Sequence, residues 1–419
     1  MPNRGLSGFP AGRGLQLGSL GDVAPSTAGV LGLKKYGEQP TFSPRTAGYR
    51  TSRGPRFDPM LSLYNGDASA FVNWHRAVGA ARAGAANAVL CVIGDSTSTG
   101  RGDDVNKHAN SWPMCLDRMM ASRFMPKSYE ALWGTHFGDN GEGLTSYDPR
   151  ATLGSGWNNA GIMGGGGFQA TAGGSGALTF TPELPFDRVR VWSLVNAANF
   201  GTLVVKVDGS SVGTTTLRTS GISVATDTFN TTLGTHTITL DGATGGAANR
   251  VDIAGIDVWD STQVGLRTFM HSRGLAKVAS FYPVPSFDIR AGMAPALTII
   301  NLTLNDVETS GETPLGEYRR TYQGIIDTAR LTGDVLMMTG NWSSGSSADY
   351  GRSEPLHRAM FEVAEDNGVP LLDLRHRWPS YTKQTAVGSG GVPQLGGGLH
   401  PFAAGYQDIA AAVYNVITR

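Results

Sequence analysis

Three polar residues in this sequence stand directly after or beside apolar segments, where their side chains could carry out acyl transfer. Ser96 closes the run AVLCVIGDS (88–96), Asn305 stands near the end of LTIINLTLND (297–306), and His400 precedes the last helical segment. A serine at the carboxyl end of a buried parallel strand is a candidate nucleophile, and a histidine that reaches it is a candidate base. Each signal alone is weak, because Gly-Asp-Ser also describes a turn with a capping serine and a lone histidine is more often a surface or core residue.

The segments around these residues predict an alternating α/β sheet. A short, continuous apolar run such as 88–96 is typical of a strand that is buried on both faces. After it, Ser111 and Pro113 suit the start of a helix. Further along the chain we expect strands at 297–306, 334–341 and 369–374 and helices at 68–86, 317–333, 356–368 and 403–419.

Residues 154–260 differ from this pattern. Charged residues become fewer, Thr and Gly become more frequent, and short alternating segments such as RVRVWSLV and TLVVKVDGSSVG are separated by turn residues. Several short strands broken by Asp-Gly turns are typical of an antiparallel β-sandwich. We therefore predict an inserted β-sandwich at 154–260, flanked by two parts of one α/β domain at 61–153 and 261–419.

Residues 1–60 form a Gly/Pro-rich segment with scattered basic residues and no helical or strand periodicity. Such a segment cannot bury enough apolar area to offset its ordering entropy. We interpret it as an arm that anchors the chain to a partner; an arm wrapped on its own domain is the alternative.

Composition excludes several classes of protein. Lys+Arg and Asp+Glu are both 34, so there is no net positive charge to bind nucleic acid. We find no apolar run of about 18 residues and no secretory signal at the N-terminus. The sequence therefore predicts neither a membrane-spanning helix nor export by a signal peptide. Cys91 and Cys115 form no disulfide framework and no metal motif, and we expect both to be reduced and packed. The sequence implies no metal and no cofactor.

In order and context these motifs resemble the SGNH (GDSL-like) hydrolase family. GDS at 94–96 resembles the first block of the family, Gly274 in MHSRGLAK the second, Asn305-Asp306 the third and His400-Pro401 the last. The resemblance covers about 61–150 and 263–419, and it implies a three-layer α/β/α fold with a parallel sheet.

The resemblance also implies a role for each residue. Ser96 would be the nucleophile and His400 the base, and the backbone N–H groups of Ser96 and Gly274 and the Asn305 amide would stabilise the oxyanion. Gly265 or Gly138 would fill the second block in a different alignment.

One position departs from the family. The family has an aspartate three residues before the histidine, and here that position is Gly397. A backbone carbonyl, a water or a distant carboxylate can hold the imidazole instead, and Asp373 is one distant candidate. We interpret Asp95 and Asp306 as structural, and His271 either as a plain loop histidine or as part of the pocket lining.

From the resemblance we expect a serine esterase that removes O-acetyl or other short acyl groups from a polysaccharide. The insert resembles carbohydrate-binding sandwiches, and the arm together with the missing signal resembles a phage tail or virion protein that acts on a host surface glycan. The expected partners are an acetylated polysaccharide and, through residues 1–60, other virion proteins; a homo-oligomer is compatible with the sequence. The alternative is a non-enzymatic glycan-binding or structural virion protein that retains the fold.

Overall fold

The computed structural model describes most of the chain from residue 57 onward. The described residues lie in one compact unit, Arg50–Arg419, and they are 57–58, 61–66, 68–102, 106–123, 125–134, 144–163, 165–171, 176–195, 202–216, 223–244, 250–282, 292–308, 313–341, 346–378, 395–396 and 400–419. The expected arm at 1–60 lies outside them except for Phe57 and Asp58, which pair with the edge of a sheet.

The α/β part is built on a seven-stranded sheet. Its spatial order is β1 (Phe57–Asp58), β2 (Leu63–Tyr64), β18 (Leu371–Leu372), β17 (Asp334–Met338), β16 (Leu297–Asn301), β3 (Ala88–Gly94) and β15 (Leu266–Ser272). The five strands from β18 to β15 are parallel, and β1 and β2 join as an antiparallel hairpin. Along the chain, β3 is followed by β15 on one side and then by β16 on the other, so the strand order reverses at β3. Ligand sites of open α/β sheets lie at such a switch point, beyond the carboxyl ends of the strands.

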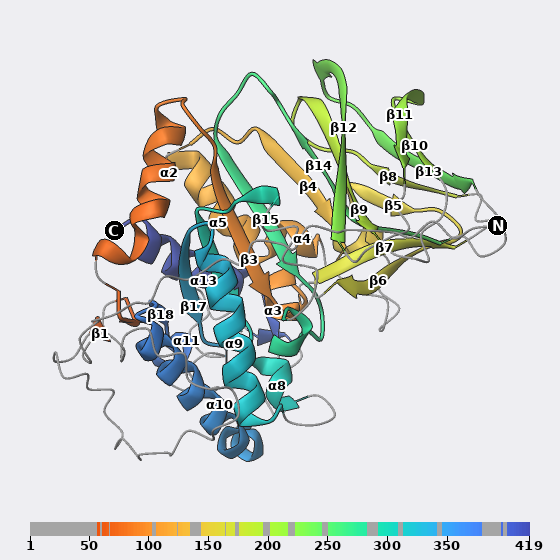
Figure 1. Ribbon diagram of the computed structural model, residues 1–419. Coiled ribbons are helices and arrows are strands. Elements are labelled where there is room, and N and C mark those ends of the chain that lie inside the picture. Colours follow the sequence, from red (N-terminus) through yellow and green to blue (C-terminus); the bar gives the residue numbers. More distant parts are fainter. Residues whose placement is uncertain are drawn as a thin grey trace, which may run out of the picture. The chain divides into compact units, whose positions relative to one another are not determined.

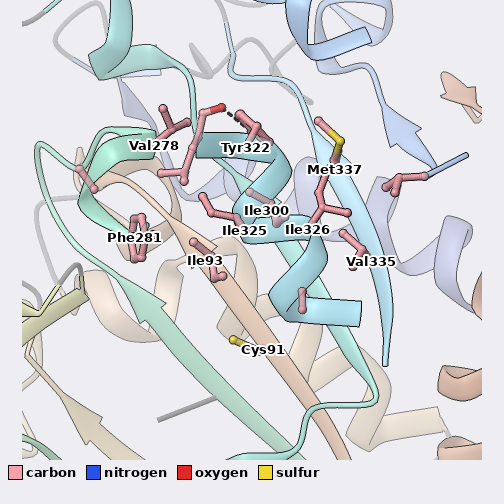
Figure 2. Close-up of a cluster of buried hydrophobic side chains, with 14 of the residues drawn as sticks. Cys91, Ile93, Val278, Phe281, Ile300, Tyr322, Ile325, Ile326, Val335 and Met337 are labelled. Carbon is pink, nitrogen blue, oxygen red and sulfur yellow. Dashed lines mark hydrogen bonds between the residues drawn. The ribbon is translucent and has the colours of Figure 1, made fainter. Parts of the chain in front are cut away.

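Helices cover both faces of this sheet. Cys91 and Ile93 of β3 pack into one cluster with α9 (Leu315–Arg330) and α10 (Ser346–Asn367), and Figure 2 shows Ile325 and Ile326 of α9 in the same cluster as Ile93 and Ile300. Leu90 and Val92 pack into a second cluster with α2 (Val72–Arg82), α5 (Trp112–Arg123) and α13 (Ala403–Ile417). Because successive strand residues point to opposite faces, a continuous apolar run is what this three-layer arrangement requires, and the predicted fold class is confirmed.

Two antiparallel sheets form a β domain within the chain (Figure 1). They share one hydrophobic cluster, to which Phe180 and Leu203 contribute from one sheet and Val191 and Ile256 from the other. The first sheet has the order β11 (Ser210–Thr216), β10 (Thr202–Val207), β13 (Ile238–Thr244), β8 (Ala177–Phe180) and β5 (Ala151–Leu153). The second has the order β12 (Ser223–Gly234), β9 (Phe186–Val195), β14 (Arg250–Trp259), β7 (Gly165–Thr171) and β6 (Trp157–Met163).

The β domain begins earlier than the predicted boundary at residue 154. β4 (Tyr129–Trp133) pairs with β14, and β5 pairs with β8. All five residues of β4 are buried, as in a strand of the α/β sheet, and its long-range pairing places it in the second sheet of the β domain.

The remaining elements are short. They are η1 (Ala68–Phe71), α3 (Ser96–Thr99), α4 (Lys107–Asn110), α6 (Leu144–Tyr147), η3 (Val278–Ser280), α8 (Leu304–Glu308), α11 (Leu374–Arg377), β19 (Leu395–Gly396) and β20 (His400–Pro401). Cys91 and Cys115 are free and buried, as expected. Among the described residues, no helix has the length and apolar character needed to cross a bilayer.

Candidate active site

Ser96 begins a tight strand-to-helix turn at the end of β3. Asp95 caps α3, because its carboxylate accepts hydrogen bonds from the Thr97 backbone N–H at 2.8 Å and the Thr97 hydroxyl at 2.7 Å; such a cap stabilises a helix by about 1 kcal/mol. Gly94 allows the turn, since a Cβ there would lie 2.1 Å from Ser98 Oγ. The interpretation of Asp95 as structural agrees with these contacts.

His400 reaches Ser96 across 304 residues of sequence: its Nε2 lies 2.8 Å from Ser96 Oγ. A neutral imidazole whose Nε2 lacks a proton accepts a hydrogen bond from the serine hydroxyl in this geometry. The sequence therefore identified the two residues that the structure brings together at the switch point of the sheet.

The loop after α3 fixes the position of His400. Gly102 has φ +111°, and a Cβ there would lie 2.5 Å from His400 Cβ and 2.9 Å from the Pro401 carbonyl oxygen. The Tyr406 hydroxyl of α13 donates a hydrogen bond to the Arg101 carbonyl at 2.5 Å. Only glycine permits this close crossing, so Gly102 is a site residue that the sequence analysis missed; a lone glycine in a glycine-rich chain gives no signal for it.

His400 is kept neutral by its surroundings. Burial lowers its pKa from 6.5 to about 4, and the positive charges of Arg101 and Lys107 act in the same direction. The imidazole is therefore in the basic form at neutral pH, as a proton acceptor must be.

Asp373 does not lie where it could orient His400. β18, which ends just before it, is three strands away from β3 in the sheet. The Asp373 carboxylate instead caps α11, accepting hydrogen bonds from the backbone N–H groups of Arg375 at 3.0 Å and His376 at 3.2 Å. The suggestion that Asp373 supplies the orienting acid is therefore corrected. Gly397 lies outside the described residues.

Gly274 lies beside the serine turn. β15 ends with Ser272 opposite Gly94 of β3, and the Arg273 N–H donates to the Gly94 carbonyl at 3.1 Å, which places the buried Gly274 just beyond the ends of both strands. Gly265 lies at the opposite end of β3, where its carbonyl accepts a hydrogen bond from the N–H of Ala88, the first residue of that strand. Seven residues of β3 span about 20 Å, so Gly265 is excluded as the second-block glycine. Gly138 lies outside the described residues.

Asn305 lies on a helix and not on a strand. β16 ends at Asn301, because its partner β3 ends at the paired Gly94, and α8 begins at Leu304. The expected strand at 297–306 is therefore too long. The Asn305 side chain is buried, and its amide donates to the Ala276 carbonyl at 3.1 Å, which links α8 to the segment that carries Gly274.

Two further polar residues hold these segments together. Asp306 accepts from the Val278 N–H at 3.2 Å and from the Thr313 hydroxyl at 2.6 Å, and burial raises its pKa to about 6. Asn301 donates to Ser98 Oγ at 3.1 Å and so fixes α3 from the neighbouring strand. The sequence analysis missed Asn301, although a polar residue that ends the apolar run LTIIN is a signal for it.

His271 is part of an aromatic cluster and not of a loop. It is buried on β15, and its ring lies 5.6 Å from the ring of Phe269 and 5.4 Å from that of Phe281. Among the residues that the structure describes, no three His, Cys, Asp or Glu side chains are grouped so that they could hold a metal ion.

Comparison with known proteins supports the fold. No protein-family model and no curated protein matches this chain. Among solved structures, a peptidoglycan O-acetylesterase superposes with a TM-score of 0.61 at 13% identity, covering 85% of this chain and 98% of its own.

More distant matches include a Bacillus subtilis protein (TM-score 0.34, 14% identity, 64% of this chain and 90% of its own). Another is a family two carbohydrate esterase from Clostridium thermocellum in complex with cellohexaose (TM-score 0.28, 14% identity, 69% of this chain and 98% of its own). At 13% identity, the superposition with the peptidoglycan O-acetylesterase shows that the two chains share a fold.

Proposed function

We propose that this protein is a serine esterase that removes O-acetyl or other short acyl groups from a polysaccharide. The observation that carries the proposal is the 2.8 Å contact between Ser96 Oγ and His400 Nε2 at the switch point of the sheet. The fold of a peptidoglycan O-acetylesterase supports the same class of substrate.

The reaction uses these two side chains in turn. Ser96 Oγ attacks the ester carbonyl carbon while His400 Nε2 accepts the hydroxyl proton. As the bond between the acyl carbon and the sugar oxygen breaks, the same proton passes to that oxygen, which leaves as a hydroxyl. Water then attacks the resulting acyl-serine while His400 accepts its proton, and His400 returns that proton to Ser96 Oγ as the carboxylic acid is released. The negative charge that develops on the carbonyl oxygen is stabilised by donors that are already in place, which we assign to the N–H groups of Ser96 and Gly274 and the amide of Asn305.

Ser96→Ala tests the proposal. We expect hydrolysis of p-nitrophenyl acetate and of an acetylated polysaccharide to fall by roughly 10³-fold or more, since the nucleophilic hydroxyl itself is removed. The matched control is Ser122→Ala, because Ser122 lies exposed on α5 and its hydroxyl bonds only to its own helix. Circular dichroism verifies folding. Full turnover in folded Ser96→Ala would overturn the assignment.

The same variant separates the enzyme from a non-enzymatic glycan-binding protein. A wild-type protein that binds the acetylated polysaccharide as tightly as Ser96→Ala does, and releases no acetate, would favour the binding protein.

We also propose that the enzyme acts as part of a phage tail or virion, attached through residues 1–60. If mass spectrometry did not detect the protein in purified virions, that proposal would be contradicted.

A further inference from the structure

Leu275 combines two properties that rarely occur together. Its backbone has φ +61°, and its side chain is 42% exposed. The left-handed region is unfavourable for residues with a Cβ, and Asn, Asp and Gly tolerate it best. The other described non-glycine residues with positive φ are Ser62, Asn65, Asn106, Asp208 and Ala294, so Leu275 is the one large apolar side chain among them. An exposed leucine gains little from burial that could offset this backbone cost.

The turn that carries Leu275 is held from several sides. Arg273 N–H donates to the Gly94 carbonyl at 3.1 Å, the Ala276 carbonyl accepts from the Asn305 amide at 3.1 Å, and the Val278 N–H donates to Asp306 Oδ2 at 3.2 Å. Gly274 and Ala276 on either side are buried. The surrounding contacts therefore impose the strained conformation and leave the Leu275 side chain outward, beside the residues that we assign to the oxyanion site. Strain of this kind is a reason to look for function.

The position in the sheet indicates what Leu275 could contact. β15 is the edge strand of the parallel sheet, next to β3, and it also contacts β4 and β7 of the β domain. Leu275 follows β15 directly after Gly274, so its exposed side chain lies next to the residues that we assign to the oxyanion site. A long glycan that continues from the ester past Gly274 would contact this turn, whereas a small ester would not need to.

We propose that Leu275 determines the preference for a polymeric substrate, its side chain packing against the apolar face of a sugar ring on the leaving-group side of the ester. The proposal rests on the esterase function proposed above and adds a subsite to it. Binding energy from such a remote contact helps to hold a large substrate in its reactive position.

The test compares Leu275→Gly and Leu275→Asn with the wild type on two substrates. Both replacements suit positive φ, so both proteins should melt at or above the wild-type temperature. We expect the ratio of kcat/KM for acetylated polysaccharide to kcat/KM for p-nitrophenyl acetate to fall roughly tenfold, mainly through KM, as the loss of a partly buried leucine contact predicts. Leu331→Asn, which alters an 82% exposed leucine after α9, is the control and should leave the ratio unchanged.

Two results would overturn the proposal. One is an unchanged ratio in both folded variants; the other is an equal loss of kcat on both substrates, which would mean that Leu275 shapes the oxyanion turn. A binding assay separates this proposal from the esterase function: polysaccharide should bind about tenfold more weakly to Ser96→Ala/Leu275→Asn than to Ser96→Ala. That difference is measurable whether or not the wild type hydrolyses the ester.

Discussion

His400 at the end of the parallel sheet and His236 in the β domain both use a ring nitrogen in a short hydrogen bond, but their partners differ. His400 Nε2 faces the hydroxyl of Ser96, which can donate a proton. His236 Nδ1 lies 2.6 Å from Asp208 Oδ2 and its Nε2 lies 2.8 Å from the Thr232 carbonyl oxygen. Both of these partners only accept hydrogen bonds, so His236 satisfies them when both its nitrogens carry protons.

The two environments move the pKa in opposite directions. Burial lowers the pKa of His400 to about 4. Partial burial also opposes a charge on His236, but the hydrogen bonds to Asp208 and Thr232 outweigh it and raise the pKa. The same residue type is therefore kept as a neutral base in one region, whereas in the other its charged form is favoured by partners that join two turns. The chemistry of the partner, and not the histidine itself, distinguishes a catalytic from a structural position.

The largest expected effect separates the two histidines directly. His400→Ala should lower kcat for p-nitrophenyl acetate by roughly 10⁴-fold or more, because Ser96 loses its base. His236→Ala should leave kcat within about twofold of the wild type, as expected for a surface substitution away from the chemistry. Steady-state kinetics on both folded variants provide the measurement, and comparable losses in the two would refute the distinction.

Asn305 should have the next largest effect. Asn305→Ala removes an amide that we assign to the oxyanion, and such a loss typically lowers kcat by about 10²–10³-fold. Asn305→Asp keeps the size of the side chain but not the donor, so it should lose at least as much. If either variant raised KM and left kcat unchanged, Asn305 would contact the substrate in its ground state instead.

The acidic limb of the pH profile reports on His400 itself. Because its pKa is about 4 and the neutral form is the base, kcat/KM should hold its plateau to about pH 5 and be half-maximal near pH 4. A histidine with the ordinary value would give a midpoint near 6.5. Circular dichroism at each pH is needed, since a depressed histidine pKa also makes the fold less stable as pH falls from 6.5 toward 4. A midpoint near 6.5 in folded protein would contradict the assigned environment.

Asp373→Asn should change the activity by less than about tenfold, whereas the same change in a working triad can cost about 10⁴-fold in kcat. The amide oxygen of the new side chain can still cap α11. A thousandfold loss in folded protein would show that Asp373 acts on His400 during the reaction.

The sequence allowed prediction of the strand, the serine and the histidine, because each leaves a local signal. The continuous apolar run at 88–94 predicts a strand that is buried on both faces. Ser96 follows this run closely, so the sequence places it at the carboxyl end of the strand. The same reasoning failed at Asn305, because the apolar run 297–306 was predicted as a single strand. Pairing stops at Asn301 because its partner Gly94 is the last residue of β3, after which the chain turns into α3. Where a strand ends therefore depends on its partner strand as well as on its own sequence.

Sequence order likewise could not show which strands are neighbours. Asp373 follows an apolar strand in the same way as Ser96 does, and only the strand order places it far from His400. β4 is fully buried like most of β3, yet it pairs with β14 in the β domain. In both cases the pairing between strands that are distant in sequence decides where the residues lie.

The smallest expected effect concerns stability and completes the comparison of the histidines. The folded-state pKa of His236 is raised above the ordinary value, so its contribution to stability is fully present below about pH 6.5 and is lost as the pH rises through the folded value. The contribution of His400 has the opposite sign, since its pKa is lowered. Hydrogen exchange of the Thr237 amide, which donates to Asp208 Oδ1 at 2.9 Å, should therefore become faster relative to its intrinsic rate as the pH rises above about 6.5. In His236→Gln, whose side chain does not titrate, this extra pH dependence should disappear while esterase activity persists. If the wild type and His236→Gln show the same pH dependence at Thr237, His236 does not hold the two turns together as a cation.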